Sequence, residues 1–241
     1  MSTLGNIYLA MEKDKSNLEK ILEIYTQAKK IKYLYDEKNK LVPVGRMANI
    51  GKGVCYDHAR YHAYLASKYK LPYRCFLHVS TDQDGVPYDR PDDVHSTLGD
   101  SHADCFIYAD GKWYLCDTTN NYSKQLVACN EDELDYALAA IMSFRIKYGQ
   151  RTDIIRGATS QDISDTVAST MVDYFNKYRS KASEMLYEVP DFADAKYDNM
   201  TYKKLVETVV KNCKPYVFDD KVLAAAKNDK LSFKGLMTTV A

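Results

Sequence analysis

The chain has 241 residues, of which 46% are hydrophobic, and its 33 basic side chains balance its 33 acidic ones. This length and composition are typical of a globular protein with one domain or two small ones. The even charge balance gives no indication of a nucleic-acid partner. No run of about 18 apolar residues is present, so the sequence predicts no membrane span.

The first residues, MSTLGNIYLAMEKDK, lack the basic start and long apolar run of a signal peptide. The sequence therefore predicts a cytoplasmic protein, although a leader removed from a longer precursor would leave no trace here. The six cysteines are spread over a chain that is large enough to fold without disulfides, so we expect them to be reduced.

The first predicted element is a helix. Ser16 and Glu19 have the spacing of a capping box, and an apolar stripe follows at helical spacing: Leu18, Ile21, Leu22, Tyr25 and Ala28. Residues Asn39 to Gly51 contain a proline and a glycine that break this pattern. We expect them to form a connecting loop.

The stretch Gly51 to Tyr69, GKGVCYDHARYHAYLASKY, predicts a tight turn followed by a second helix. Cys55 lies in the first turn of that helix, where backbone N–H groups and the helix dipole favour a thiolate over a thiol. Such a position suits a nucleophile. The alternative is that Cys55 is a small buried hydrophobic residue.

A zinc site is a second alternative for this helix. Cys55, His58 and His62 share one helical face and could ligate zinc by their spacing. The sequence offers no clear fourth ligand, and a zinc-bound Cys55 could not act as a nucleophile. We therefore predict no metal and expect His58 and His62 to have packing roles.

Residues Tyr73 to Ser80 have the β-branched and aromatic content of a buried strand. Residues Thr81 to Asp100, rich in aspartate and proline, predict a long loop of the kind that often serves as a lid. Asp82 and Asp84 could instead begin a calcium loop, but their spacing does not match an EF-hand. His78 and His95 have no partner that the sequence identifies.

The stretch Ser101 to Thr119, SHADCFIYADGKWYLCDTT, predicts a β-hairpin, because Asp110-Gly111 favours a type I′ turn. If these two residues form the loop, His102 and Asp117 become diagonal neighbours on one face, about 7 to 8 Å apart. A carboxylate at that place can fix the tautomer of an imidazole and stabilise its charged form.

Together the segments GKGVCYDHARYHAYLASKYKLPYRC and HADCFIYADGKWYLCDTT resemble the transglutaminase-like domain of the papain-like cysteine protease superfamily. The resemblance covers about Val44 to Asn120. It implies an α+β fold in which a nucleophile helix packs on an antiparallel sheet. It also implies a catalytic triad of Cys55, His102 and Asp117, which needs no cofactor.

The resemblance further implies acyl transfer from an amide of a protein or peptide: deamidation, cross-linking or peptide hydrolysis through a thioester. Asn49 is a candidate donor to the oxyanion, or else a turn residue. The alternative function is a non-catalytic peptide- or protein-binding module on the same fold.

One residue departs from the family pattern. Asp104 stands where the family has an aromatic residue, and the hairpin register places it opposite Asp117. The repulsion predicts that one carboxyl group is protonated or that a bulge shifts the register. Asp104 is also a candidate for binding a positively charged group of the substrate.

The remainder of the chain predicts helices over Glu131 to Tyr148, Asp162 to Arg179, Tyr202 to Lys211 and Asp219 to Lys230. We therefore predict a catalytic core with its N-terminal helix over residues 1–130. A mostly helical C-terminal extension, residues 131–241, packs on that core.

Overall fold

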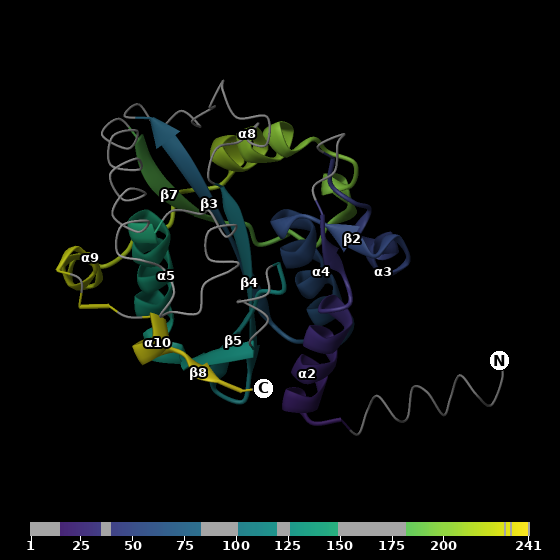
Figure 1. Cartoon of the computed structure of the whole chain (residues 1–241), viewed down its shortest axis with the longest axis horizontal. Helices are drawn as coiled ribbons and strands as arrows, with labels where there is room; N and C mark the ends of the chain where they lie inside the picture. Colours follow the sequence, from purple (N-terminus) through teal and green to yellow (C-terminus); the bar gives the residue numbers. More distant parts are fainter. Residues whose placement is uncertain are drawn as a thin grey trace, which may run out of the picture.

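The computed structural model describes residues 15–34, 40–82, 101–119, 126–148, 182–228, 230–231 and 233–240. At its centre is a six-stranded sheet in the order β7-β3-β4-β5-β6-β8, in which every neighbouring pair is antiparallel. Helices α2 and α4 cover one face, and α5 covers the other (Figure 1). The predicted α+β class is confirmed at this level.

The strands of the sheet are β3 (Tyr73–Asp82), β4 (His102–Ala109), β5 (Lys112–Cys116), β6 (Leu126–Asn130), β7 (Ala182–Glu188) and β8 (Thr238–Thr239). A separate parallel pair consists of β1 (Lys32–Tyr33) and β2 (Lys52–Gly53). The helices are α2 (Asn17–Ala28), α3 (Met47–Ile50), α4 (Cys55–Lys68), α5 (Leu134–Tyr148), α8 (Tyr202–Asn212), α9 (Asp220–Lys227) and α10 (Phe233–Leu236). Three 3-10 turns, Val44–Arg46, Glu131–Glu133 and Ala195–Tyr197, complete the described elements.

Helix α2 has the predicted cap and apolar face. The Ser16 hydroxyl accepts a hydrogen bond from the Glu19 N–H at 3.2 Å, and the Glu19 carboxylate accepts one from the Ser16 N–H at 2.7 Å. This reciprocal pair satisfies two N–H groups at the start of the helix. The residues that α2 buries toward α4 are Ile21, Ile24, Tyr25 and Ala28.

The segment before the cysteine is more ordered than the predicted loop. It contains the 3-10 turn Val44–Arg46 and helix α3, which ends at Gly51 with a φ of 68°. Gly53 is required for a different reason, since a Cβ added there would lie 2.6 Å from the Cβ of Asp57. The chain can therefore pass close to α4 only with glycine at this position.

Helix α4 begins at Cys55, as predicted, and Asp57 fixes its start. One carboxylate oxygen of Asp57 accepts a hydrogen bond from the Val54 N–H at 3.0 Å, and the other accepts one from the Val42 N–H at 2.7 Å. The backbone on both sides of the 3-10 turn and α3 is thereby tied to the first turn of the cysteine helix.

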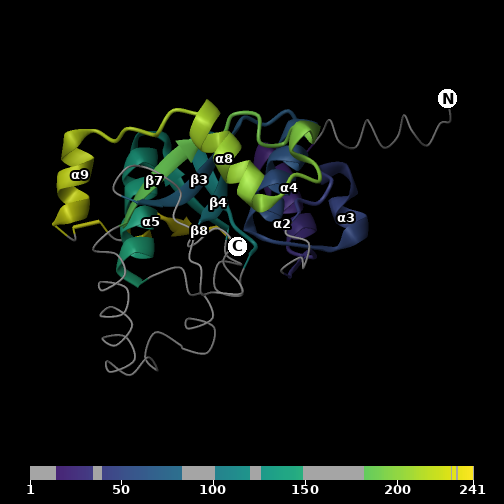
Figure 2. The same ribbon diagram turned by 90° about the horizontal axis from the view of Figure 1, so that it is seen from above.

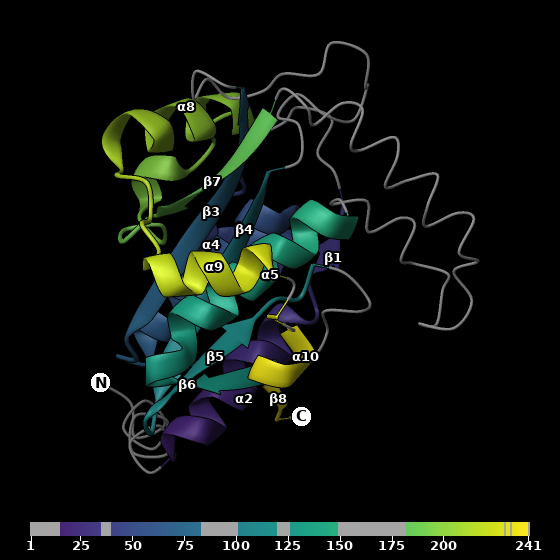
Figure 3. The same ribbon diagram turned by 90° about the vertical axis from the view of Figure 1, so that its left-hand side faces the viewer.

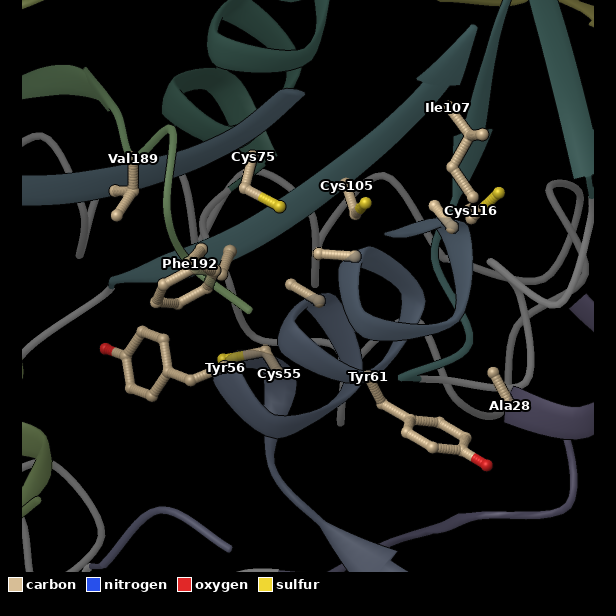
Figure 4. Packing of buried hydrophobic residues seen from close by; sticks show 14 of the residues in the cluster. Ala28, Cys55, Tyr56, Tyr61, Cys75, Cys105, Ile107, Cys116, Val189 and Phe192 are labelled. Carbon is tan, nitrogen blue, oxygen red and sulfur yellow. The ribbon is translucent and has the colours of Figure 1, made fainter. Parts of the chain in front are cut away.

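Alanines and cysteines line the contact between α4 and the sheet. Ala59, Ala63 and Ala66 are buried along α4. In Figure 4 the side chains of Cys75, Cys105 and Cys116 extend from the strands toward that helix. Small side chains on both surfaces allow a helix to approach a sheet closely.

Arg60 fastens α4 to the segment that follows β7. Its side chain is fully buried and donates to the carbonyl oxygens of Val42 and Phe192, each at 3.1 Å. It also donates to the carbonyl oxygen of Asp194 at 3.0 Å and to the carboxylate of Asp198 at 2.6 Å. Every nitrogen of the guanidinium therefore has a partner.

The predicted hairpin is present. Asp110 and Gly111 have φ values of 50° and 80°, as a type I′ turn requires, and Ala109 pairs with Lys112. The β4–β5 pairing runs from there to Phe106 and Leu115 and ends. The strands are thus no longer paired at the level of Asp104 and Asp117.

In the described part of the chain after residue 130, two strands accompany the helices. Helices α5, α8 and α9 match predicted helices, whereas the predicted helix at 162–179 lies outside the described residues. Strands β7 and β8 pair with β3 and β6 and form the two edges of the sheet. The predicted boundary near residue 130 therefore does not separate the sheet from the rest of the chain.

The views from other directions show the same layers. Seen from above, α5 and α9 lie on one side of the strands, with α2, α3 and α4 on the opposite side (Figure 2). From the α5 side, α5 and α9 lie in front of the sheet (Figure 3). The sheet therefore has two apolar clusters, one against each helical layer.

Candidate active site

His102 and Asp117 meet where strands β4 and β5 separate. His102 is the first residue of β4, and its Nε2 lies 3.2 Å from Oδ2 of Asp117. The other oxygen of Asp117 accepts hydrogen bonds from the N–H of Thr119 at 2.9 Å and from its hydroxyl at 2.6 Å. The structure thus brings together two of the three predicted triad residues and adds Thr119, which holds the carboxylate.

Asp104 is a second carboxylate on the same imidazole. Its Oδ1 also lies 3.2 Å from Nε2 of His102, and its Oδ2 lies 2.7 Å from Nε2 of His78 on β3. The Asp104 side chain is 3% exposed. The surroundings of Asp104 therefore do not favour the expected role in binding a positively charged group of the substrate, because both of its carboxylate oxygens face histidines.

The pKa of each carboxyl group is lowered, which does not favour the expectation that their repulsion would protonate one of them. Burial raises the pKa of Asp104, but the charge and hydrogen bond of His102 and the hydrogen bond of His78 outweigh it, and the pKa lies well below its usual value. Burial likewise raises the pKa of Asp117, but its hydrogen bond with His102 and the charge of that ring lower it overall. The β4–β5 pairing ends before Asp104 and Asp117, so the two residues are not paired opposite each other as the register predicted.

The partners of His102 determine its tautomer. Two ionised carboxylates can only accept hydrogen bonds, so the proton of the neutral ring lies on Nε2. The second ring nitrogen, Nδ1, is then the one that gains and loses a proton. This arrangement makes His102 suitable as a general base.

Cys55 lies in the apolar layer between α4 and the sheet. Its side chain is 8% exposed and belongs to the cluster that contains Ala103 and Cys105 (Figure 4). These two residues alternate along β4 with His102 and Asp104, which therefore point to the other face of the strand. Among the described residues, no hydrogen bond joins the Cys55 Sγ to the imidazole of His102.

Contacts between neighbouring residues nevertheless link the two groups. The hydroxyl of Tyr56, next to Cys55, makes a short contact with the hydroxyl of Ser101, next to His102. His58 Nδ1 lies 2.7 Å from the hydroxyl of Thr118, next to Asp117. The first turn of α4 is therefore held against the ends of both strands that carry the His102–Asp117 pair.

Asn49 lies in α3 and is exposed to solvent. None of the described hydrogen bonds around Cys55 and His102 involves it, so its predicted role as an oxyanion donor has no structural support. Residues 83–100, which include Asp84 and His95, lie outside the described part of the chain. The predictions of a lid and of a calcium loop fall mostly on this segment.

The sequence did not identify a partner for His78. Strands β3 and β4 pair with His78 directly opposite His102, which places both rings beside Asp104. The signal that the sequence does carry is that both histidines lie in predicted strands. The register between those strands could not be predicted, because a long segment of the sequence separates them, whereas the register of a hairpin is fixed by a short turn.

The predicted packing roles of the helix histidines agree with the structure. His58 and His62 are buried, and His62 Nδ1 donates to the carbonyl oxygen of His58 at 2.7 Å. Among the described residues, the side chains with ligand atoms close enough to share a metal are His102, Asp104 and Asp117, within 4.8 Å of one another. This set could hold a divalent cation, although the hydrogen bonds among its members already satisfy these atoms.

The burial of His62 predicts an acid-sensitive fold. Burial lowers the pKa of His62 from 6.5 to about 4, and its Nε2 has no hydrogen-bond partner among the described residues. The unfolded chain therefore binds a proton between pH 6.5 and pH 4 that the folded chain does not, and stability falls as the pH decreases through this range. We expect a loss of about 2 kcal/mol between pH 7 and pH 5 from this residue.

Urea unfolding of the wild type and His62→Gln at both pH values measures this contribution. Glutamine does not titrate, so the variant is expected to lose less stability on acidification. Equal losses in the two proteins would show that His62 is not responsible.

Two cavities lie elsewhere on the molecule. One, of about 610 Å³, lies among α2, α3 and α4 and includes Lys30, Ala48 and Tyr61. The other, of about 490 Å³, is lined by residues of β3, β5, α5 and α9. Neither is lined by Cys55, His102 or Asp117, so cavity size does not identify the reactive groups.

No protein-family model matches this chain, and no curated protein matches it. In the described part of the chain, every helix is too short or too polar to cross a membrane. The function of the site has to follow from its own residues.

Proposed function

We propose that this protein is a cysteine-dependent amide acyltransferase or hydrolase with a transglutaminase-like, papain-like core. Cys55 is the nucleophile, His102 is the general base and acid, and Asp117 orients His102. The observation that carries the proposal is the His102 Nε2 to Asp117 Oδ2 contact of 3.2 Å. This contact lies at the ends of β4 and β5, and the first turn of α4 packs against these ends.

The reaction follows from these groups. Nδ1 of His102 takes the proton of the Cys55 thiol, and the sulfur attacks the carbonyl carbon of an amide. The carbon–nitrogen bond breaks as His102 returns the proton to the departing amine, which leaves a thioester. Water or a second amine then attacks the thioester, gives its proton to His102, and regenerates the thiol when the proton moves to sulfur.

The first turn of α4 supplies a donor for the oxyanion. Val54, the residue before the helix, has no side-chain atom that can accept a hydrogen bond, so it cannot cap the N–H groups that follow. The N–H of Cys55 is in this turn and can donate to the oxygen of the tetrahedral intermediate. This donor takes the place of the side chain of Asn49.

Reaction requires that sulfur and imidazole meet. His102 is at the end of β4, where pairing with β5 has ceased, and its side chain is 12% exposed. Rotation of the imidazole toward the sulfur is possible at this strand end, but it breaks a hydrogen bond of Nε2 with Asp104 or Asp117. The Tyr56–Ser101 contact keeps the backbone of the two reacting residues close during this movement.

The substrate that we propose is an amide of a protein or peptide, and the compartment is the cytoplasm. The six cysteines are all free thiols in the structure, which suits a reducing compartment. The competing proposal is a peptide- or protein-binding module on the same fold. The burial of Cys55 favours that alternative, and its reactivity distinguishes the two.

Iodoacetamide labelling tests the nucleophile. Burial raises the pKa of the thiols of Cys105 and Cys213, and it raises that of Cys129 to about 11, so these groups are expected to react slowly at pH 7. Cys55 is expected to react at least about 10-fold faster than Cys213, as followed by mass spectrometry of tryptic peptides. Equal rates would favour the binding module.

A peptide library, incubated with and without a primary amine, identifies the reaction. A gain of about one mass unit reports deamidation, an amine adduct reports transfer, and a cleaved peptide reports hydrolysis. The matched control is Cys55→Ala, which removes the sulfur and should abolish each product. Activity that survives in this variant, or that chelators remove, would contradict a thiol mechanism.

A further inference from the structure

We propose that His78 and Asp104 form a second carboxylate arm that positions His102, in addition to the one that Asp117 provides. This inference rests on the proposed function, in which His102 is the base. The described contacts form a continuous path from His78 Nε2 through both oxygens of Asp104 to His102 Nε2, with separations of 2.7 and 3.2 Å. The arm occupies the position at which this chain departs from the family pattern.

Two carboxylates lie beside the single N–H group of His102 at Nε2. Oδ1 of Asp104 and Oδ2 of Asp117 lie at the same distance from His102 Nε2, so the proton there is shared between them. The oxygen of each carboxylate that does not face His102 accepts from another donor: His78 in one case and Thr119 in the other. The Asp104 arm and the Asp117 arm are therefore built alike. In each, one carboxylate oxygen faces His102 and the other accepts a hydrogen bond from a second residue.

Two consequences follow for the imidazole. Two points of attachment orient the ring more narrowly than one, since rotation away from either carboxylate breaks a hydrogen bond. Two negative charges also stabilise the imidazolium that forms when Nδ1 takes a proton from sulfur. The described titratable groups beside the ring and its carboxylate partners are His78 on β3, Asp104 on β4 and Asp117 after β5. Tyr56 on α4 contacts Ser101, the residue before His102.

NMR titration of the His102 ring in the full chain tests the arm without any substrate. In Asp104→Asn, which keeps the shape and removes the charge, the titration midpoint of His102 is expected to move to lower pH by about one unit. His78→Phe leaves the buried Oδ2 of Asp104 without that donor and is expected to produce a shift in the same direction. His78→Gln, whose amide can donate to the same oxygen, is expected to restore much of the midpoint.

The control is His62→Gln, which changes a buried histidine of α4 that has no contact with His102 in the described structure. An unchanged midpoint in both Asp104→Asn and His78→Phe would overturn the arm. Labelling of Cys55 in the same samples separates the two proposals. If the midpoint shifts but Cys55 reacts no faster than Cys213 in the wild type, the arm stands and the thiol mechanism fails.

Discussion

Replacing His102 with alanine is expected to lower the turnover of any amide substrate by about 10²- to 10⁴-fold, the range that a general acid–base residue contributes. The variant loses the group that takes the proton of the thiol and delivers it to the departing amine. Its Cys55 should also react more slowly with iodoacetamide, because no imidazolium remains to stabilise the thiolate. The measurement compares both rates with those of the wild type at pH 7.

A milder substitution beside Asp117 serves as the control for His102→Ala. Thr119→Val removes the hydroxyl that Oδ1 of Asp117 accepts but keeps the backbone N–H that binds the same oxygen. It should reduce turnover by less than about 10-fold, the equivalent of one hydrogen bond of about 1 kcal/mol. If His102→Ala is as active as Thr119→Val, His102 is not the base.

The second large effect concerns the buried guanidinium of Arg60. In Arg60→Met, three carbonyl oxygens and the carboxylate of Asp198 lose a donor. Removing one partner from a buried ion pair destabilises a protein by about 3 to 5 kcal/mol. Urea unfolding followed by circular dichroism should show a loss of this size.

The matched control is Arg46→Met, since Arg46 is an arginine of the 3-10 turn Val44–Arg46 and its side chain is exposed. A surface substitution of this kind changes stability by about 0.5 kcal/mol or less. Arg60→Lys keeps the charge but not the planar set of donors, so it should fall between the two. A loss in Arg60→Met no larger than in Arg46→Met would show that these hydrogen bonds contribute little net stability.

Local chemistry made part of the site predictable. The Asp110-Gly111 turn has its own conformational requirement, and it fixes the register of the hairpin. That register brings His102 and Asp117 to the same side of the sheet. The start of the cysteine helix is likewise set by residues within a few positions of Cys55, such as Gly53 and Asp57.

The rest depends on pairings between distant segments. Nothing near His78 specifies that it lies opposite His102, because the residues between their strands leave the register open. The segment Ala182–Glu188 is a strand because β3 offers it an edge, not because its sequence alternates clearly. The position of Asn49 along the chain predicts that it belongs to the site, whereas α3 places it on the surface.

The order in which the strands are synthesised leaves the edges of the sheet open for a time. Strands β3 to β6 leave the ribosome before either β7 or β8 has been synthesised. Until then, β3 and β6 present open backbone N–H and C=O groups that neighbouring nascent chains can pair with. Because β8, which pairs with Val127 and Ala128 of β6, follows β7 in the chain, the β6 edge stays open for longer during synthesis than the β3 edge.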